Sequence, residues 1–387
     1  MASGDAERGR QGLNFLAYRH RYNQTAEPAQ LQKAQVPITE PLESSLQAFA
    51  DRTALNIAGV AFSYRQLHSR SLAIQQHLLA LLPAGDDVPV VAICLGKSIE
   101  LYASILAVLG CGAIYLPLES GHPLQRQQAM LENASASILL DDGRHPLRDG
   151  FVTLDVSAID SRPADRTQRL MRRRPPAESP CMLFYTSGTT GQPKGVLLSQ
   201  YNLAHFTAWL GAHVQLTEHS RVLQFSPLSF DSSLIDIFAA LIAGAELIVP
   251  SDDQRRDPQQ LVELIRGQRV SHAFLPPALL SILPLDQSLG LTHLLTGGEV
   301  CEPTVIERLT GQCHLHNLYG PTEATVLVTS RTLQTGDSNR NLGAPIANSQ
   351  VLILDEHLQP VDQQVMGELY IVGPGVSLGY VNQPQQT

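Results

Sequence analysis

The sequence predicts an α/β fold in which two helix-flanked β-sheet subdomains are followed by a small β subdomain. Two stretches, 41–175 and 176–335, alternate short apolar segments with amphipathic ones, as strands and crossover helices do. Residues 336–387 change to short strands separated by tight turns. The length of 387 residues exceeds that of one ordinary compact domain, and 43% hydrophobic residues can form a large core. Residues 1–40 are polar and rich in glutamine, and we expect a poorly ordered lead-in there.

The first stretch contains a continuous apolar run, VPVVAICL (88–95), which indicates a strand covered on both faces. The run from Leu101 to Leu118 carries no charge and is long enough to raise the question of a membrane span. Two glycines and a proline interrupt its second half, however. A buried helix followed by a buried strand is the better interpretation, and we expect no membrane contact.

Composition argues against several function classes. Lysine and arginine number 27 against 36 acidic residues, a formal charge of −9, so nonspecific nucleic-acid binding is not expected. The five cysteines are scattered and show no C-x-x-C spacing. They argue against a disulfide framework or a zinc site and favour small buried side chains in a reducing, cytoplasmic compartment.

A loop with the composition of a phosphate-binding site lies in MLFYTSGTTGQPKGVLL (182–198). Glycines let backbone N–H groups approach phosphate oxygens, hydroxyls add hydrogen bonds, and a lysine offsets charge. Lys194 is one of only three lysines in the chain. Gly195 follows it, so the loop is not a Walker loop. An ordinary hairpin loop would not need so many hydroxyls beside a rare lysine.

The segment TSGTTGQPKG resembles the phosphate loop of the adenylate-forming superfamily, which includes nonribosomal peptide synthetase adenylation domains, acyl-CoA synthetases and luciferase-like enzymes. Further segments resemble family motifs in the family's order and extend over nearly the whole chain from residue 41. They are FSYRQL (62–67), GCGAIYLPLE (110–119), FSPLSFDSS (225–233), NLYGPTE (317–323) and GELYIVGPGVSLGY (367–380). The resemblance implies the large N-terminal core of the adenylate-forming fold.

The resemblance also implies ATP and Mg²⁺ as cofactors. Catalytic roles would fall on Thr186, Lys194, Thr322 and Glu323, with Glu323 as the metal ligand. A hard cation takes carboxylate and phosphate oxygens, which suits that glutamate. The alternative for Glu323 is a surface acid in a Pro-initiated turn. The expected ATP contacts are Thr186, Ser187, Gly188, Thr189, Thr190, Gly191, Lys194, Gly298, Asn317, Tyr319 and Thr322.

Asp231 indicates the substrate class. In amino-acid-activating members of the family an aspartate at this position binds the α-ammonium, whereas acyl-activating members generally lack it. The alternative is a helix N-cap before SSLIDIF. The matched side-chain pocket is apolar apart from one serine, with room expected at Gly297 and depth limited by Phe274 and the leucines. We therefore expect valine, isoleucine or leucine, with proline and alanine as alternatives. The expected substrate-binding residues, each also a credible core residue, are Asp231, Ser232, Ile235, Phe274, Leu295, Gly297, Leu318, Val326 and Leu327.

The function implied is ATP-dependent formation of aminoacyl-AMP with release of pyrophosphate. Transfer to the phosphopantetheine thiol of a peptidyl carrier protein would follow. The alternatives are an acyl- or aryl-CoA ligase, against which Asp231 argues, and a non-catalytic nucleotide-binding remnant. The sequence ends at Thr387, before the family's ribose-binding Asp motif, hinge and C-terminal lid with its catalytic lysine. We expect the lid to be absent and this portion alone to be poorly active.

Overall fold

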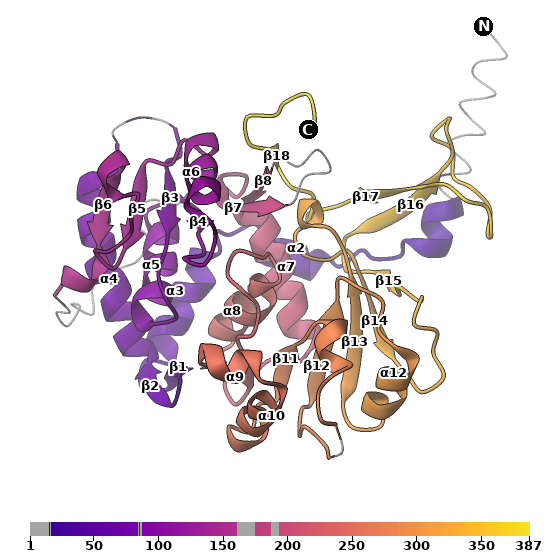
Figure 1. Ribbon diagram of the computed structural model, residues 1–387. Coiled ribbons are helices and arrows are strands. Elements are labelled where there is room, and N and C mark those ends of the chain that lie inside the picture. Colours follow the sequence, from indigo (N-terminus) through magenta and orange to yellow (C-terminus); the bar gives the residue numbers. More distant parts are fainter. Residues whose placement is uncertain are drawn as a thin grey trace, which may run out of the picture.

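The computed structural model describes residue 15 and residues 17–83, 85, 87–160, 175–186, 193–285 and 287–387. Two large sheets with helices packed against them and a two-stranded ribbon make up this part of the chain (Figure 1). The predicted α/β class is confirmed. Both sheets carry antiparallel strands at their edges, so they are mixed rather than purely parallel.

The seven-stranded sheet is parallel in its interior. Its strands, in spatial order, are β18 (Gly379–Tyr380), β8 (Lys194–Ser199), β7 (Pro180–Thr186), β4 (Ile114–Pro117), β3 (Val90–Ile93), β5 (Ile138–Asp141) and β6 (Val152–Asp155). Every residue of β3, β4 and β5 is buried, as predicted for a strand covered on both faces. α4 (Tyr64–Leu81) precedes β3, α5 (Ile99–Gly110) connects β3 to β4, and α6 (Leu124–Asn133) connects β4 to β5. The described helices are all too short or too polar to cross a bilayer.

The nine-stranded sheet is parallel from β13 to β1 and antiparallel at both ends. Its strands, in spatial order, are β15 (Ala344–Pro345), β14 (Thr329–Leu333), β13 (His314–Tyr319), β12 (His293–Gly297), β11 (His272–Phe274), β9 (Arg221–Leu223), β10 (Glu246–Val249), β1 (Thr53–Ile57) and β2 (Val60–Ser63). Its helices are α7 (Gln200–His213), α8 (Ser233–Ile242), α9 (Asp252–Arg256), α10 (Pro258–Gly267), α11 (Pro277–Leu280) and α12 (Pro303–Thr310). The ribbon consists of β16 (Gln350–Leu354) and β17 (Glu368–Val372).

The sheets do not follow the expected boundary at residue 175. β1 and β2, from the first stretch, extend the nine-stranded sheet through β10. β7 and β8, from the second stretch, complete the seven-stranded sheet, and β18, from the last stretch, pairs with β8. Hydrophobic periodicity reveals a strand but not its partner, which can lie far away in the sequence. Each sheet with its helices, which we call the seven-stranded body and the nine-stranded body, therefore contains strands from distant parts of the sequence.

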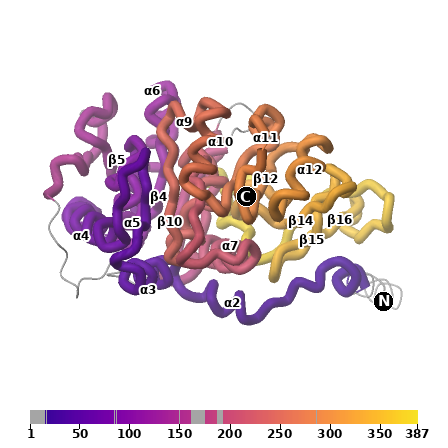
Figure 2. Tube along the Cα trace, turned by 90° about the horizontal axis from the view of Figure 1, so that it is seen from below, coloured from indigo at the N-terminus to yellow at the C-terminus, as the bar shows by residue number. Residues whose placement is uncertain are grey.

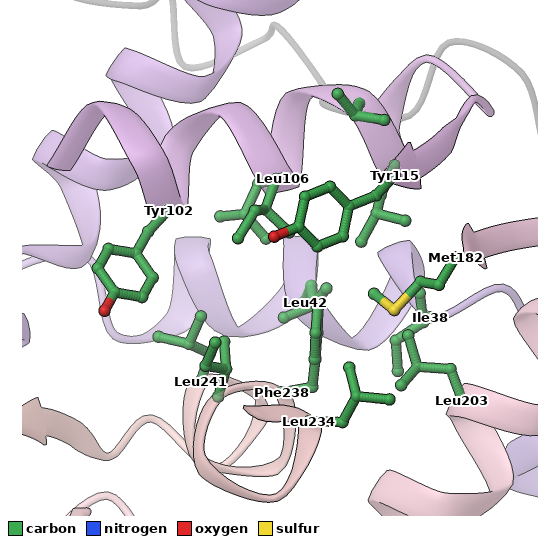
Figure 3. Packing of buried hydrophobic residues seen from close by; sticks show 14 of the residues in the cluster. Ile38, Leu42, Tyr102, Leu106, Tyr115, Met182, Leu203, Leu234, Phe238 and Leu241 are labelled. Carbon is green, nitrogen blue, oxygen red and sulfur yellow. The ribbon is translucent and has the colours of Figure 1, made fainter. Parts of the chain in front are cut away.

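One apolar core fills the space between the two bodies. Leu42 of α3 (Thr39–Ala48), Leu106 of α5 and Phe238 of α8 point toward one another (Figure 3), and each is at most 2% exposed. Burying a side chain of this size contributes roughly 1.5–3 kcal/mol. The shared core fixes one sheet against the other.

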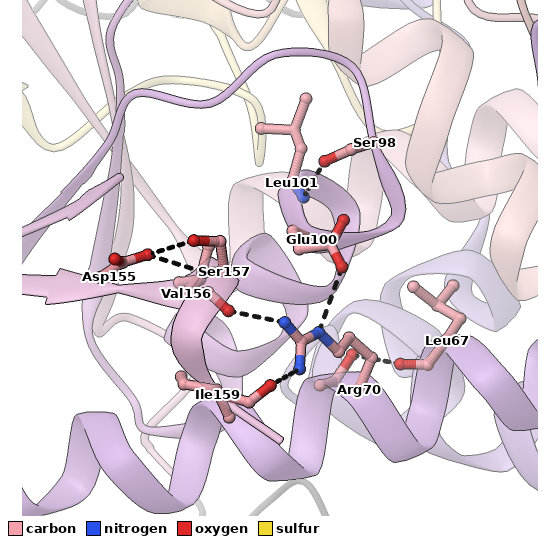
Figure 4. Close-up of polar contacts among 10 residues, drawn as sticks. Leu67, Arg70, Ser98, Glu100, Leu101, Asp155, Val156, Ser157 and Ile159 are labelled. Atoms are coloured by element: carbon pink, nitrogen blue, oxygen red, sulfur yellow. Dashed lines mark hydrogen bonds and ion pairs between the residues drawn. The ribbon is translucent and has the colours of Figure 1, made fainter. Parts of the chain in front are cut away.

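Arg70 of α4 braces the outer part of the seven-stranded sheet (Figure 4). Its guanidinium donates to the carbonyl oxygens of Ile159 and Val156, each at 2.6 Å. Its Nε lies 3.4 Å from Oε1 of Glu100, in the first turn of α5. These contacts tie the segment after β6 to both helices, close to the loop through which β3 enters α5.

The expectation of a poorly ordered lead-in over residues 1–40 is wrong for its second half. The tube in Figure 2 runs through α2 (Pro28–Ala34) along the lower edge of that view into α3. Ala34 and Ile38 are fully buried. Asn23 exchanges two hydrogen bonds with the backbone of Val351 in β16, at 3.1 and 2.8 Å. Specific pairing and a few buried side chains anchor this polar segment, and composition alone did not reveal them.

Candidate active site

The predicted phosphate loop connects the two strands of a hairpin in the seven-stranded sheet. β7 ends at Thr186 and β8 begins at Lys194, and these two residues are paired in antiparallel register. The Thr186 hydroxyl donates to the Lys194 carbonyl oxygen at 3.5 Å. The hairpin thus fixes both ends of the loop. The predicted ATP contacts Ser187, Gly188, Thr189, Thr190 and Gly191 lie outside the described residues.

Tyr380 joins this hairpin to the predicted metal ligand. Its hydroxyl donates to Oε1 of Glu323 at 2.5 Å, and its ring centroid lies 5.2 Å from Nζ of Lys194. The hydrogen bond to Glu323 and partial burial raise the pKa of Tyr380 to about 12. A cation over an aromatic face is attracted to it. Our sequence analysis assigned Tyr380 no role, although it ends the GELYIVGPGVSLGY motif.

The predicted α-phosphate residues lie beside the predicted ammonium anchor. Thr322 and Glu323 open the short 3₁₀ helix η3 (Thr322–Ala324). The Thr322 side chain lies close to the carboxyl group of Asp231. Burial raises the pKa of Asp231, the Thr322 side chain lowers it, and the nearby Glu323 carboxylate raises it. Two neighbouring carboxylates of this kind are stabilised by a cationic ligand group.

The helix-cap interpretation of Asp231 finds no support in the geometry. The N-cap of α8 is Ser232, and that position makes no side-chain cap hydrogen bond. The Asp231 carboxyl lies close to the Thr322 side chain and to the backbone of Ser232 instead. Its contacts therefore point from the start of α8 toward η3.

The predicted pocket residues come from three adjacent strands, one helix and one loop. Phe274 is in register with Leu295, and Gly297 with Leu318. Because side chains two apart share a face of a strand, these four positions face the same side of the sheet. The members that belong to, or pack against, one buried cluster are Ile235, Phe274, Leu295, Leu318, Val326 and Leu327. Ser232 is half-buried at the start of α8.

Gly297 has a different role from the one expected. A Cβ at this position would lie 2.4 Å from the carbonyl oxygen of Leu318 in the neighbouring strand. The close approach of β13 therefore requires glycine, and the missing side chain does not open space for a substrate. The surrounding apolar side chains set the size of the pocket.

The predicted adenine contacts lie on the opposite face of β13 from Leu318. Asn317 and Tyr319 flank that leucine in the strand, so their side chains point the other way. The Asn317 amide donates to the carbonyl oxygen of Asn341 at 3.0 Å, and the Tyr319 side chain is exposed. Gly298 follows β12 with a positive φ of 86°. One strand therefore separates the predicted nucleotide contacts from the predicted side-chain pocket.

The fold and this site define an α/β core with a glycine- and hydroxyl-rich hairpin loop and two carboxylates at the junction of its sheets. The chain belongs to the AMP-binding enzyme family, which matches residues 42–381. It is 31% identical over 378 residues to bacitracin synthase 3 of Bacillus licheniformis, covering 97% of this chain and 6% of that protein. It is 34% identical over 383 residues to novobiocin biosynthesis protein H of Streptomyces niveus, covering 95% and 63%. The chain thus spans less than two thirds of these relatives' own lengths.

Solved structures show the same core. The AMPPNP-bound nonribosomal peptide synthetase FmoA3 superposes with a TM-score of 0.82 at 26% identity, over 96% of this chain and 41% of that one. A four-domain nonribosomal peptide synthetase bound to AMP and glycine gives 0.80 at 27%, over 91% and 26%. The N-terminal subdomain of Klebsiella oxytoca NpsA shares the fold, with a TM-score of 0.77 at 24% identity over 91% of both chains. The predicted N-terminal core of an adenylation domain is confirmed.

Proposed function

We propose that this chain activates an aliphatic L-amino acid as aminoacyl-AMP, with valine, isoleucine or leucine preferred. The contact between Asp231 and Thr322, beside Glu323, carries the proposal. It brings an anion suited to an α-ammonium next to the residues expected at the α-phosphate. The similar four-domain synthetase binds AMP and glycine, which supports a nucleotide and an amino acid sharing one site.

In the proposed first step, a carboxylate oxygen of the amino acid attacks the α-phosphorus of ATP. An O–P bond forms, the bond from the α-phosphorus to its bridging oxygen breaks, and pyrophosphate leaves. Asp231 holds the ammonium and Lys194 offsets phosphate charge, so the chain contributes positioning and electrostatic stabilisation. In the second step, the phosphopantetheine thiol of a carrier protein loses its proton and attacks the acyl carbon. A thioester forms and AMP leaves.

The residues present fit a magnesium ion held jointly with nucleotide phosphates. Within the described ranges, no group of three or more His, Cys, Asp or Glu side chains could hold a metal alone. Mg²⁺ commonly takes one or two protein carboxylates and completes its shell with phosphate oxygens and water. Glu323 would supply that carboxylate, with Tyr380 fixing its orientation through the 2.5 Å hydrogen bond. Bound there, the ion would offset the negative charge of the phosphates.

The apolar pocket supports the aliphatic choice. Leu295, Leu318 and Leu327 are each at most 5% exposed, and their side chains offer no partner for a polar tip. Burying such a tip unpaired is costly. One methylene is worth only about 1–3 kcal/mol, so selection among valine, isoleucine and leucine should be modest. Proline is the nearest rival. The five cysteines are free thiols, which suits the proposed cytoplasmic setting.

Calorimetric titration of residues 1–387 with stable acyl-sulfamoyl adenosines tests the proposal. The panel carries valyl, leucyl, prolyl, aspartyl and lysyl groups, together with an unbranched fatty-acyl group. We expect valyl and leucyl to bind most tightly. Asp231→Ala should weaken them about a hundred- to a thousandfold, because an ammonium loses its buried partner. Asp362→Ala, at an exposed aspartate, is the matched control.

Three outcomes would contradict the proposal. Tighter binding of the fatty-acyl analogue than of any aminoacyl one would favour an acyl-activating enzyme. Equal binding of every analogue, whatever its acyl group, would favour the nucleotide-binding remnant, and failure to bind any, in a preparation that unfolds cooperatively, would favour another function.

A further inference from the structure

The segment that carries Asp231 belongs to neither a strand nor a helix. Residues 224–232 connect β9 to α8 and cross the junction between the two sheets. The position of a carboxylate on such a connection depends on the hydrogen bonds that attach the connection to its surroundings. The attachments of this segment therefore decide how well Asp231 is positioned.

The nine-stranded body grips the beginning of the segment. Oδ2 of Asp236, in α8, accepts the backbone N–H groups of Phe225 and Ser226 at 3.1 and 2.9 Å. Nε of Arg255, in α9, donates to the carbonyl oxygen of Phe225 at 2.9 Å. Asp236 is fully buried. These contacts end five residues before Asp231.

The other body grips the segment nearer to Asp231. Glu119 follows β4 of the seven-stranded sheet, at the end of the motif GCGAIYLPLE. Its Oε1 accepts both the backbone N–H of Ser229, at 3.3 Å, and the hydroxyl of Ser229, at 3.2 Å. Ser229 lies two residues before Asp231. Hydrogen bonds to an ionised carboxylate are roughly twice as strong as neutral ones.

A buried cationic side chain, Lys97, interacts electrostatically with both Glu119 and Asp236. It lies in the loop between β3 and α5, its Nζ is buried, and it makes no hydrogen bond within the described residues. Burial lowers its pKa to about 8 and Arg255 acts in the same direction, while Asp252, Asp236 and Glu119 raise it.

We propose that Glu119 is a positioning residue for amino-acid recognition, which holds the segment bearing Asp231 through Ser229. This inference rests on the proposed role of Asp231. Glu119 does not touch the substrate in this scheme. Through Ser229, it fixes the Asp231 carboxylate relative to the seven-stranded sheet, which carries the proposed phosphate-binding hairpin. The seven-stranded sheet thereby positions the contacts to both the phosphate and the ammonium group of an aminoacyl-adenylate.

A pair of ligands that differ only in the ammonium tests this directly. Valyl-sulfamoyl adenosine and its des-amino counterpart, isovaleryl-sulfamoyl adenosine, are titrated into residues 1–387. The dissociation constant of the isovaleryl ligand divided by that of the valyl ligand measures ammonium recognition. The isovaleryl constant alone measures the remaining contacts. We expect Glu119→Ala to lower the ratio about tenfold, the loss of one charge-assisted contact, while the des-amino constant changes less than about twofold.

Three further variants sharpen the result. Glu119→Gln keeps an oxygen acceptor for Ser229 and should restore most of the ratio. Ser229→Ala removes one of the two hydrogen bonds without touching the carboxylate, and should lower the ratio about threefold. Glu356→Ala, at a glutamate whose side chain is 87% exposed, should leave both constants unchanged.

The outcomes separate this inference from the proposed function. An unchanged ratio in Glu119→Ala and Ser229→Ala, while Asp231→Ala collapses it, would overturn the role of Glu119 and leave the proposed function standing. Equal weakening of both ligands would show that Glu119 is merely structural and would also overturn the inference. A wild-type chain with no preference for the amino ligand would refute both.

Discussion

A row of stacked imidazoles on the pocket face of the nine-stranded sheet should make the fold sensitive to acid. His272, His293 and His314 are in register on β11, β12 and β13, and His316 lies two residues beyond His314. We call these four residues, with His213 of α7, the histidine ladder. The His293 ring stacks on those of His272 and His316 with centroids 5.0 and 5.2 Å apart. Nδ1 of His293 lies 2.9 Å from Nε2 of His316.

Burial is the main reason that the ladder resists protonation. Together with a smaller effect of neighbouring ladder histidines, it lowers the pKa of His293 to about 4 and that of His316 to about 3. No carboxylate within the described part of the chain is among the groups acting on either ring. The unfolded chain would bind protons near pH 6.5, so stability is fully present above that pH and is lost as the pH falls. For His316 the loss at pH 4.5 amounts to about 3 kcal/mol.

Replacing His316 by glutamine should therefore change the pH dependence of stability more than stability itself. At pH 7.5 the variant should be less stable than the wild type by about 1–3 kcal/mol, because stacking and the Thr332 hydrogen bond of 3.1 Å are altered. Between pH 6.5 and 4.5 that deficit should shrink by about 1.4 kcal/mol per pH unit. The sign follows because the variant no longer has a site that takes up a proton on unfolding.

Urea unfolding at pH 7.5, 6.0 and 4.5, at constant ionic strength, measures the effect. His357→Gln is the control, since that side chain is 79% exposed and its variant should parallel the wild type at every pH. Identical pH slopes for wild type and His316→Gln would refute the reasoning, because they would mean that His316 has the same pKa in the folded and unfolded chain.

Three further perturbations follow from the same geometry. Lys194→Ala should weaken AMPPNP binding about ten- to a hundredfold with an unchanged thermal midpoint, and a marked loss of stability without nucleotide would contradict its assignment. Tyr380→Phe removes the hydrogen bond to Glu323, so the Mg²⁺ concentration needed for half-maximal AMPPNP binding should shift severalfold, measured by calorimetry. Burial raises the pKa of Asp236 to about 7, so stability should fall as pH rises from about 4 to 7. Asp236→Asn should remove that decline in urea unfolding, and an unaltered slope would exclude the shift.

Local patterns in the sequence were sufficient for the elements that carry the site. The run at 88–95 predicted the fully buried β3, and the glycine- and hydroxyl-rich segment predicted the loop of the β7–β8 hairpin. Neither observation identified neighbours. Tyr380 reaches Glu323 because β18 pairs with β8, across more than 180 residues of sequence. Pairing of that kind is decided by the whole fold, and no local period records it.

The histidine ladder also depends on strand pairing that the sequence did not reveal. SHAF, THLLTGG and HLHNLYG each place a histidine two residues before an apolar one, so alternation alone puts both on one face of their strand. Stacking requires that the three strands be adjacent, parallel and in register, which the sequence did not state. The histidines were therefore unremarked, although the residues beside them were predicted to line a pocket.

The register of strand β13 determines which of its residues face the predicted pocket and which face the predicted nucleotide side. Leu318 faces the side-chain pocket, while Asn317 and Tyr319 face the predicted nucleotide side. A slip of one residue would exchange these faces, so both ligand contacts would be lost together. Five in-register pairs with β12 and five with β14 oppose such a slip. Gly297 opposes it as well, because its missing Cβ is what allows Leu318 to approach β12 at that level. The predicted contacts of NLYGPTE with two ligands thus depend on its place between β12 and β14, a pairing that the sheet provides by itself.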